Sequence, residues 1–341
     1  MAQVSDFNYQ LPEELIAQEP LKERTASRML VVSRENESFH DDVFSNFPQY
    51  LRPGDCLVLN NTRVFPARLR GRRNSSSGAE VELLLVRALD EQEKHWRVLA
   101  RPGKRVRNGD KLLFGLSLEA TVEDSGEFGE RTVRFEADSP VRAILEQIGQ
   151  IPLPPYIHRS PDGQDRERYQ TVFSEKHGSA AAPTAGLHFT PEMLARCSAA
   201  GAAIAYVTLH VGLGTFAPLR AEELSQIQLH EEYFEISRDN AETMRAAQRI
   251  VCVGTTSVRT TETAMLRGGL QSMSGETNLF IHPGFHFRAT DAMLTNFHLP
   301  QSSLLMLVCA LGGKDLVLSA YKHAVQERYR FFSYGDCMLV L

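Results

Sequence analysis

Ile250-Val251-Cys252-Val253-Gly254-Thr255-Thr256-Ser257-Val258-Arg259 is the stretch of sequence that decides the fold class of this chain. Its apolar start predicts a buried strand that ends at Gly254, and a helix is predicted over residues 258–267. A strand that passes almost directly into a helix is typical of α/β proteins, whose ligand sites lie beyond the carboxyl ends of the strands. We therefore expect an α/β fold with ligand-binding groups in the turn that follows this strand.

The alternation of strands and helices continues on both sides of this stretch. Thr190, Ser237 and Ser302 are suited to cap helices, because their hydroxyls can accept a hydrogen bond from a free N–H group of the first turn. Expected strands cover residues 29–32, 56–59 and 204–211, and expected helices cover residues 11–16, 190–201, 240–248, 304–311 and 316–329. Both ends of the chain therefore contribute to one main α/β domain.

The segment between these parts has a different texture. Short strands are expected over residues 79–86, 96–100, 112–114, 118–122 and 132–135, with turn-rich pieces between them. This pattern predicts a small all-β barrel or sandwich. We expect two domains: residues 1–62 and 151–341 form the α/β catalytic domain, and residues 63–150 form the inserted β-barrel domain.

The composition of the 341 residues, with 43% hydrophobic and 23% charged, is that of a globular protein. No apolar run approaches the ~20 residues that span a bilayer, and the first residues lack the basic cluster of a signal peptide, so we expect no membrane association. The five cysteines lie far apart and never form Cys-x-x-Cys, which argues against disulfides and a thiolate zinc site. A cytoplasmic location is expected.

Three loops carry polar groups in positions suited to bind a ligand. Two of them follow expected strands, and the third, residues 182–190, leads into a helix N-terminus, where free N–H groups favour anions. Their hydroxyls, glycines, histidines and one arginine give the candidates: Thr184, Gly186, His188, His210, Gly212, Gly214, Thr215, Thr255, Thr256 and Arg259. Each loop taken alone is also compatible with an ordinary capped turn, and a lone Gly-x-Gly is weak evidence.

A metal site formed by histidines is the next possibility to weigh. His282 and His286 are four residues apart, and His298 could join them. Pro283 and Gly284, however, interrupt the helix that a His-x-x-x-His zinc site needs. We therefore expect no metal.

Two basic clusters lie in the expected β insert without an acidic residue between their members. The clusters are Arg63, Arg68, Arg70, Arg72 and Arg73, and then Arg97, Arg101, Lys104, Arg105 and Arg107. Because the net charge of the chain is −5, the attraction of a polyanion must be local, and such clusters can follow RNA phosphates. We predict phosphate contacts at Arg70, Arg72 and Arg105. The alternative is that these arginines form a solvated face of the barrel.

A set of motifs that runs in order along the chain is similar to that of a known family. It includes Pro-Thr-Ala-Gly-Leu-His-Phe-Thr (183–190), Leu-His-Val-Gly-x-Gly-Thr-Phe (209–216), Val-Gly-Thr-Thr-Ser-Val-Arg (253–259), Thr-Asn-Phe-His-Leu-Pro (295–300) and Tyr-Arg-Phe-Phe-Ser-Tyr-Gly-Asp (329–336). On these motifs the chain resembles the S-adenosylmethionine:tRNA ribosyltransferase-isomerases of queuosine biosynthesis. The family pattern differs at His282 and His286, to which we assign no role.

This resemblance implies a fold and an activity. The fold is an α/β domain with an inserted β-barrel. The activity is transfer and isomerisation of the ribosyl part of S-adenosylmethionine onto 7-aminomethyl-7-deazaguanine at the wobble position of tRNA, which yields epoxyqueuosine-tRNA, adenine and methionine. S-adenosylmethionine is then a consumed substrate, no cofactor is permanently bound, and the partners are this substrate and that tRNA. We expect a monomer.

The implied reaction needs a general base, a proton donor to adenine and a clamp for the methionine end of the substrate. Histidines in the matched motifs titrate near neutrality and are the acid/base candidates: His188, His210 and His298. Glu232 is the next candidate base. Arg259, with the loop of Thr255 and Thr256, is the candidate carboxylate clamp, and Asn296 completes the candidate substrate site.

Two other functions stay open from the residues themselves. An ordinary RNA methyltransferase that uses S-adenosylmethionine would carry a Gly-rich loop after its first strand and an acidic residue after its second, an arrangement that this sequence lacks. A non-catalytic RNA-binding adaptor would depend on the basic barrel alone. The products formed from labelled S-adenosylmethionine separate these functions.

Overall fold

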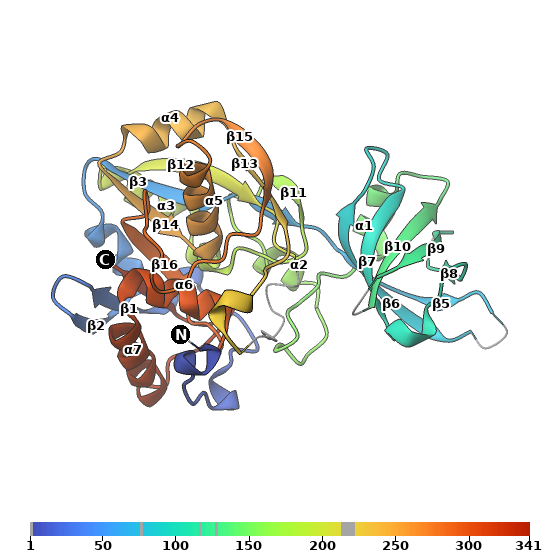
Figure 1. Cartoon of the computed structure of the whole chain (residues 1–341), viewed down its shortest axis with the longest axis horizontal. Helices are drawn as coiled ribbons and strands as arrows, with labels where there is room; N and C mark the ends of the chain where they lie inside the picture. The colour runs from blue at the N-terminus through green and yellow to red at the C-terminus, as the bar shows by residue number, and fades with distance from the viewer. Residues whose placement is uncertain (1–2, 76–77, 116, 127–128, 213–221) are drawn as a thin grey trace.

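The structure is a computed structural model that describes residues 3–75, 78–115, 117–126, 129–212 and 222–341. A large α/β part and a barrel that projects from one side of it are visible in Figure 1. Strands from both ends of the chain form the α/β part, and the barrel comes from the sequence between them. The predicted fold class is therefore confirmed.

A nine-stranded mixed sheet forms the centre of the α/β part, in the order β15-β13-β12-β3-β14-β16-β17-β1-β2. These strands are β1 (Arg28–Ser33), β2 (Ser38–Val43), β3 (Asp55–Asn60), β12 (Ala203–Leu209), β13 (Glu232–Ile236), β14 (Arg249–Val253), β15 (Met273–Thr277), β16 (Ala292–Asn296) and β17 (Cys337–Val340). β12, β3, β14 and β16 are parallel neighbours, and antiparallel pairs flank them on both sides. The carboxyl ends of β14 and β16 thus lie at the same edge of the sheet.

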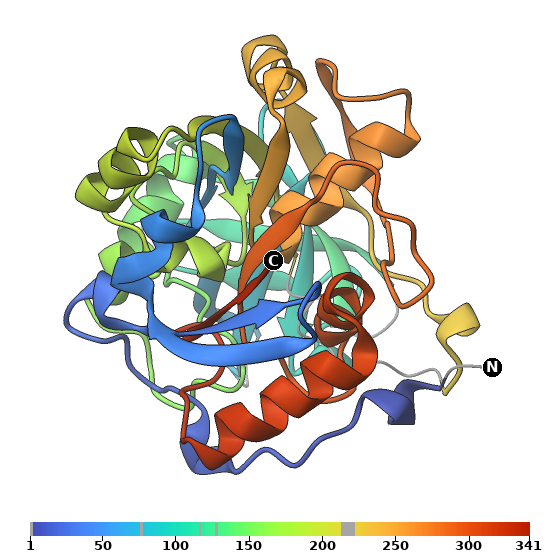
Figure 2. The ribbon, with the colours of Figure 1, turned by 90° about the vertical axis from the view of Figure 1, so that its left-hand side faces the viewer.

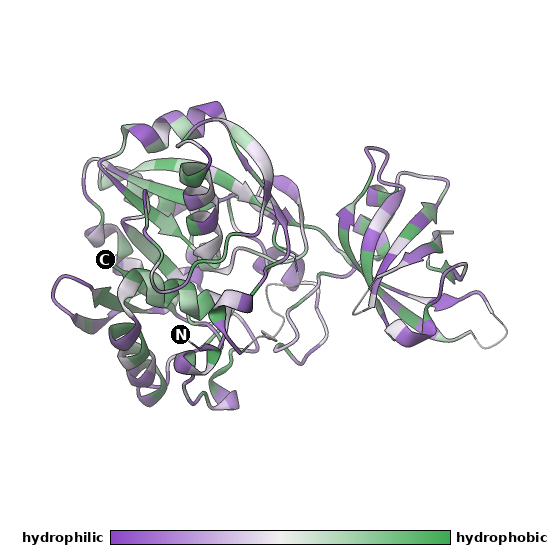
Figure 3. Ribbon diagram, in the orientation of Figure 1, coloured by the Kyte–Doolittle hydropathy of each residue, from purple (hydrophilic) through white to green (hydrophobic). Residues whose placement is uncertain are grey.

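Helices cover both faces of this sheet. Three of its inner strands, β3, β16 and β17, are therefore buried along their whole length. One core includes residues of α4 (Arg238–Ala246), α5 (Thr255–Leu266), α6 (Ser303–Gly312) and α7 (Lys314–Gln326); the other includes residues of α3 (Pro191–Ala199) and the 3-10 helix η4 (Phe44–Tyr50). Figure 2 shows α7, in red, beside the blue strand β1, with which it is in contact. Figure 3 shows the apolar centre of the α/β part and its polar outer faces.

The helix starts confirm the predicted caps. Thr190, Ser237 and Ser302 precede α3, α4 and α6, and each hydroxyl accepts a hydrogen bond from the N–H group three residues later. α5 begins at Thr255, earlier than predicted, because Gly254 adopts φ +85° and turns the chain directly from β14 into the helix. The predicted helix over residues 11–16 is a short 3-10 helix, η2 (Glu13–Leu15).

The second body is a closed barrel with the strand order β10-β7-β6-β5-β8-β9. Its strands are β5 (Arg68–Arg73), β6 (Glu80–Ala88), β7 (His95–Arg101), β8 (Lys111–Leu113), β9 (Glu119–Ser125) and β10 (Glu130–Glu136), and helix α1 (Val141–Ile148) contributes to the same core. Polar and apolar residues alternate along several of these strands in Figure 3.

The arginine-rich strand β5 was not among the predicted strands. Arg70 and Arg72 are exposed on it, whereas Leu69 is fully buried and Gly71 is half-buried. A Cβ atom on Gly71 would lie 2.4 Å from the carbonyl oxygen of Leu113 and 2.4 Å from the Phe114 ring, so this position needs glycine. A strand with arginines at every outward position lacks the apolar pattern by which strands are predicted.

The chain enters and leaves the barrel at one point. The N–H group of Arg68 donates to the carbonyl oxygen of Gln150 at 3.1 Å, and the N–H group of Gln150 donates to that of Arg68 at 2.9 Å. Nearby, β4 (Thr62–Val64) pairs with β11 (Lys176–Ser179) in a separate two-stranded sheet. That residues 63–150 form a domain of their own stays a prediction.

None of the described helices is long and apolar enough to cross a bilayer by itself; α6 and α7 pass such a test only as a pair, and that pair is bent by 116°. All five cysteines are buried and free of disulfides. Within the described ranges, no group of three or more His, Cys, Asp or Glu side chains is arranged to hold a metal ion.

Candidate active site

Three loops meet beyond the carboxyl ends of β14 and β16. They are the 3-10 helix η7 (Thr184–His188), the turn at Gly254 and the end of β16 at Asn296. The N–H group of Gly254 donates to Leu294 in β16 at 2.7 Å, and a Cβ atom on Gly254 would lie 3.6 Å from that of Ala185 in η7. Two of the loops predicted to bind a ligand therefore lie side by side.

His188 is the titratable group at this junction. It is only 4% exposed, and its ring lies against Phe44 with a centroid separation of 5.3 Å. Burial is the main cause that lowers the pKa of His188 to about 4; the Asn296 carboxamide acts in the opposite direction, and the charges of Arg24 and Arg330 also lower the pKa. The imidazole is therefore neutral at pH 7, as a general base must be.

Ser27 determines which ring nitrogen of His188 is available. The Ser27 hydroxyl lies 2.8 Å from Nδ1 and also 3.5 Å from the carbonyl oxygen of Arg24, to which it can donate. Donation to this carbonyl places the ring proton on Nδ1 and the lone pair on Nε2, whereas donation to Nδ1 places the proton on Nε2. Nε2 is buried and has no hydrogen-bond partner among the described residues, and the Asn296 side chain lies close enough to raise the pKa of the ring. In the first tautomer Nε2 can take a proton from a substrate.

Two further buried polar atoms lack hydrogen-bond partners in the described part of the chain: Oδ1 of Asn296, whose side chain lies close to His188, and Oγ1 of Thr256, in the first turn of α5. Asn296 is held in place, because its Nδ2 donates to the carbonyl oxygen of Phe332 at 2.9 Å. Buried polar atoms are nearly always hydrogen-bonded in folded proteins, and each exception calls for an explanation. A substrate that supplies partners to these atoms explains their lack of partners within the protein.

His210 follows the end of β12, at a different part of the sheet. Its Nδ1 lies 2.8 Å from the Thr62 hydroxyl, and its ring stacks on Tyr233 at 5.5 Å. A Cβ atom on Gly178 would lie 2.6 Å from Nε2, so the other ring nitrogen packs against that glycine. Burial chiefly lowers the pKa of His210 to about 4. None of these contacts joins His210 to the loop of His188.

His298 is part of the hydrophobic core. Its Nε2 lies 2.8 Å from the Thr295 hydroxyl, its backbone N–H group donates to Tyr321, and its carbonyl oxygen accepts a hydrogen bond from Tyr9. Burial lowers its pKa to about 3. The sequence grouped His298 with His188 as an acid/base candidate, whereas the contacts assign it to the packing of three segments.

Arg259 is engaged inside the protein, which revises the predicted clamp. Its Nη1 forms an ion pair with Glu232, its Nε donates to the carbonyl oxygen of Leu279 at 3.1 Å, and both charged side chains are 5% exposed. Glu232 also accepts a hydrogen bond from the N–H group of Gly212 at 3.1 Å. Only Nη2 of Arg259 lacks a described partner. A bidentate clamp on a substrate carboxylate therefore does not fit this arrangement.

The remaining candidates of the α/β part differ in accessibility. Gly186 is closely packed, because a Cβ atom there would lie 2.8 Å from both Phe173 and Thr171. Thr184 at the start of η7 is half-buried, and Thr255 in the first turn of α5 is buried. No atom of the described residues lies within 4 Å of the position of a Cβ atom on Gly212. Gly214 and Thr215 lie outside the described residues.

The candidate RNA-binding arginines lie on the barrel, far along the sequence from these loops. Arg70 is 58% exposed and pairs with Glu82 at 3.6 Å. Arg72 is exposed and makes no ion pair within the part of the chain that the structure describes, and Arg105 is exposed in η5 (Gly103–Arg105). The carbonyl oxygen of Arg105 accepts a hydrogen bond from Arg73. Their contact with RNA stays a prediction.

Comparison with known proteins relates nearly the whole chain to one family. Residues 4–340 match the model of a family described as queuosine biosynthesis protein. The chain is 55% identical to S-adenosylmethionine:tRNA ribosyltransferase-isomerase of Solibacter usitatus (strain Ellin6076), with 99% of each protein covered. The crystal structure of S-adenosylmethionine tRNA ribosyltransferase from Thermotoga maritima is 38% identical and has a TM-score of 0.57, with 99% of this chain and 100% of that chain covered. These matches include every loop that builds the site, and the chain belongs to the queuosine biosynthesis protein family.

Proposed function

We propose that this protein transfers and isomerises the ribosyl part of S-adenosylmethionine onto 7-aminomethyl-7-deazaguanine at the wobble position of tRNA. Epoxyqueuosine-tRNA, adenine and methionine are the products. Membership of the family and the name of the Solibacter relative support this proposal. The observation in the structure that carries it is the neutral, buried imidazole of His188, whose unpartnered Nε2 lies beside Asn296.

In the proposed reaction one proton moves from the substrate to His188 and then to adenine. The positive sulfur of S-adenosylmethionine acidifies the adjacent 5′ carbon of the ribose, and Nε2 of His188 takes the proton from that carbon. The resulting ylide opens the ribose ring, and the bond to adenine breaks. His188, now an imidazolium, returns its proton to the departing adenine, which restores the neutral base. The aminomethyl nitrogen of the tRNA then attacks the 1′ carbon and loses a proton to solvent, and closure of the epoxide breaks the bond between carbon and sulfur and expels methionine.

Polar groups around His188 bind and orient the substrate in this proposal. Asn296 Oδ1 accepts a hydrogen bond from a donor of the substrate, and Thr256 Oγ1 supplies a second contact from the first turn of α5. Both side chains belong to ordered ends of strand and helix, so their positions are fixed before the substrate binds. Nη2 of Arg259 is one further donor, in a single contact. His210 and His298 then have supporting roles in the fold.

The same proposal covers the substrates, the RNA contacts and the location of the protein. S-adenosylmethionine is consumed as a substrate and does not stay bound as a cofactor, and the reaction needs no metal. Arg70, Arg72 and Arg105 contact tRNA phosphates from the barrel. The protein acts as a monomer in the cytoplasm.

Product analysis tests the proposed function. The protein is incubated with S-adenosylmethionine labelled in the ribose and with tRNA that carries 7-aminomethyl-7-deazaguanine. Adenine and methionine in equal amounts, with the label transferred to tRNA, are the expected result. S-adenosylhomocysteine would instead identify a methyltransferase, and binding of tRNA without turnover would identify an adaptor.

A further inference from the structure

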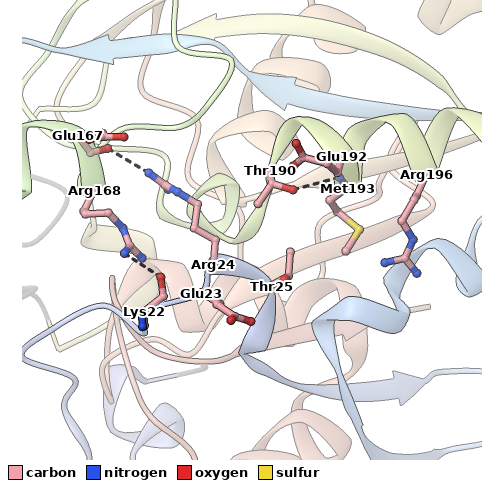
Figure 4. A pocket seen from close by; sticks show the side chains of 10 residues that line it. All are labelled: Lys22, Glu23, Arg24, Thr25, Glu167, Arg168, Thr190, Glu192, Met193 and Arg196. Carbon is pink, nitrogen blue, oxygen red and sulfur yellow. Dashed lines mark hydrogen bonds between the residues drawn. The ribbon is translucent and has the colours of Figure 1, made fainter.

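A cleft of about 560 Å³ lies at the surface next to the loop of His188 (Figure 4). Three segments that are distant in sequence form it: the 3-10 helix η3 (Arg24–Ala26) with the residues before it, helix α2 (Asp165–Arg168) and helix α3. The side chains that line it include four cations: Lys22, Arg24, Arg168 and Arg196.

These four cations make no ion pair with a carboxylate in the described ranges, whereas about half of the described arginines do. Arg24 instead donates to the carbonyl oxygens of Leu187 and Glu167, each at 3.0 Å. Arg168 donates to those of Leu21 and Lys22, and Arg196 to that of Ser45. The guanidinium groups are therefore held in fixed positions without loss of their charge.

Three carboxylates also line the cleft, so its four cations leave a net charge of +1. Glu192 is turned toward the start of α3, where its own N–H group and the Thr190 hydroxyl lower its pKa. Glu23 is exposed. Glu167 lies close enough to act on Arg24, but burial and the neighbouring charge of Arg168 outweigh it and lower the pKa of Arg24. Two like charges held together in a half-buried position favour the binding of an anion.

The cleft is linked directly to the proposed base. Arg24 holds the carbonyl oxygen of Leu187, the residue before His188. Ser27, which hydrogen-bonds to His188, is the residue that ends η3. Arg24 at the start of η3 would thus bind the anion, while Ser27 at the end of η3 orients the imidazole.

We propose that this cleft binds backbone phosphates of the tRNA, next to the nucleotide that is modified. The inference rests on the proposed function. A polynucleotide fits the observations better than the single carboxylate of S-adenosylmethionine, because the cations come from separate elements and two of them, Lys22 and Arg196, are exposed. Several phosphates along one strand can engage such spaced charges at the same time.

Charge reversal at the two exposed cations tests the inference. The variant Lys22→Glu/Arg196→Glu avoids Arg24 and Arg168, which brace the fold. We expect its Kd for tRNA, titrated without S-adenosylmethionine at several salt concentrations, to rise by tenfold or more at ~0.1 M salt, and the slope of log Kd against log salt to fall by roughly two. The KM for S-adenosylmethionine is expected to stay within about twofold.

A matched control carries the same change of net charge elsewhere. Lys314→Glu/Lys322→Glu alters two exposed lysines of α7, which does not line the cleft. We expect its Kd for tRNA to change by less than about threefold, with an unchanged salt slope. The neutral variant Lys22→Gln/Arg196→Gln should show an intermediate loss. It also serves if the reversed variant does not fold, as judged by its circular dichroism and melting temperature.

Three results would overturn the proposed binding of tRNA phosphates in the cleft. A Kd and slope for the cleft variants equal to those of the control would overturn the inference, and so would a raised KM for S-adenosylmethionine with unchanged tRNA binding. Loss of tRNA binding only in Arg70→Glu/Arg72→Glu/Arg105→Glu would also overturn it and would place the phosphate contacts on the barrel. Because the titration needs no turnover, a wild-type protein that binds tRNA through the cleft but releases no adenine would refute the proposed function alone.

Discussion

At the scale of single residues, the surroundings of His188 differ from those of the other two acid/base candidates. One of its ring nitrogens is occupied by Ser27 and the other faces unpartnered atoms, whereas His210 and His298 pack their Nε2 atoms against protein groups. A base needs a free lone pair within reach of the substrate as well as a suitable pKa. Of the three histidines, His188 is the one with a fully buried ring nitrogen that has no hydrogen-bond partner among the described residues.

Substitution of His188 by glutamine should therefore remove most of the activity. We expect kcat for adenine release to fall by roughly 10²–10⁴-fold, with a change of less than about threefold in the KM for S-adenosylmethionine. Single-turnover release of adenine measures this effect. The control is His40→Gln, at an exposed position on β2, which should leave kcat within about twofold.

The same assay compares the three histidines predicted from the sequence. His210→Gln and His298→Gln should lower kcat far less than His188→Gln, once any loss of folded protein is taken into account. A loss below tenfold in all three variants would show that the base is not a histidine.

Most residues of this candidate site could be named from the sequence, but the hydrogen bonds between them could not. His188, Asn296 and Thr256 stand in motifs that could be recognised. Ser27 carries no such signal, because its hydrogen bond to His188 spans 161 residues of chain and depends on the register of β1 in the sheet. For His298, a motif position does not reveal whether a side chain points to the substrate or to the core.

At the scale of secondary-structure elements, the ion pair of Arg259 and Glu232 joins α5 to β13. Arg259→Ala would leave the Glu232 carboxylate buried without its partner, which typically costs about 3–5 kcal/mol. We expect the free energy of unfolding, measured in urea, to fall by about that amount. The KM for S-adenosylmethionine would rise only if Nη2 also binds the substrate.

The double variant Arg259→Met/Glu232→Gln separates these two effects. It removes both charges, so much of the lost stability should return. A KM that returns to the wild-type value in this variant indicates a structural pair. A KM that stays raised in a stable double variant would support a direct contact between Arg259 and the substrate.

In the barrel, Gly71 of β5 packs against the end of β8 without room for a side chain. Gly71→Ala would force a methyl group to within 2.4 Å of the Leu113 carbonyl oxygen, so we expect a loss of about 1–3 kcal/mol in the free energy of unfolding. Gly115→Ala is the matched control, because its methyl group would meet Ile148 at an ordinary 3.6 Å. Equal stability of the two variants would contradict the packing described here.

Elements with strong local signals were predictable, and elements defined by distant partners were not. The capping hydroxyls of Thr190 and Ser302 act within three residues, so the starts of α3 and α6 followed from the sequence. β5 and β17 escaped prediction for different reasons. β5 presents arginines outward, and the four buried residues of β17 form a strand only because β1 and β16 lie on either side of them.

At the scale of the whole molecule, four histidines with a lowered pKa make stability depend on pH: His177, whose pKa is lowered chiefly by burial, and the three acid/base candidates. The pKa values of His188, His210 and His298 are about 4, about 4 and about 3, against ~6.5 in an unfolded chain. Between about pH 6.5 and pH 4 the unfolded chain therefore binds more protons. We expect the free energy of unfolding to fall across this range by about 1.4 kcal/mol per pH unit for each of these three histidines.

Urea denaturation at successive pH values tests this dependence. His298→Gln should lower the slope by about 1.4 kcal/mol per pH unit, whereas His286→Gln, at an exposed position, should leave it unchanged. Carboxyl groups with a lowered pKa, such as Asp165, act mainly below about pH 4 and do not obscure the effect. A slope that does not change in His298→Gln would show that this imidazole is not buried in its neutral form.

Strands that are neighbours in the main sheet are far apart in the sequence, which affects folding during synthesis on the ribosome. All six barrel strands are encoded between Arg68 and Glu136, so each has its neighbours as soon as that stretch has emerged. β3, in contrast, is made early but lies between β12 and β14, and β1 pairs with β17 at the far end of the chain. During synthesis β3 must wait, unpaired, for β12 and β14, and β1 can pair with β2 but lacks its other neighbour, β17, until the end of the chain is made. The nascent chain is therefore most exposed to aggregation and to chaperones through its N-terminal segment, while the barrel can already be complete.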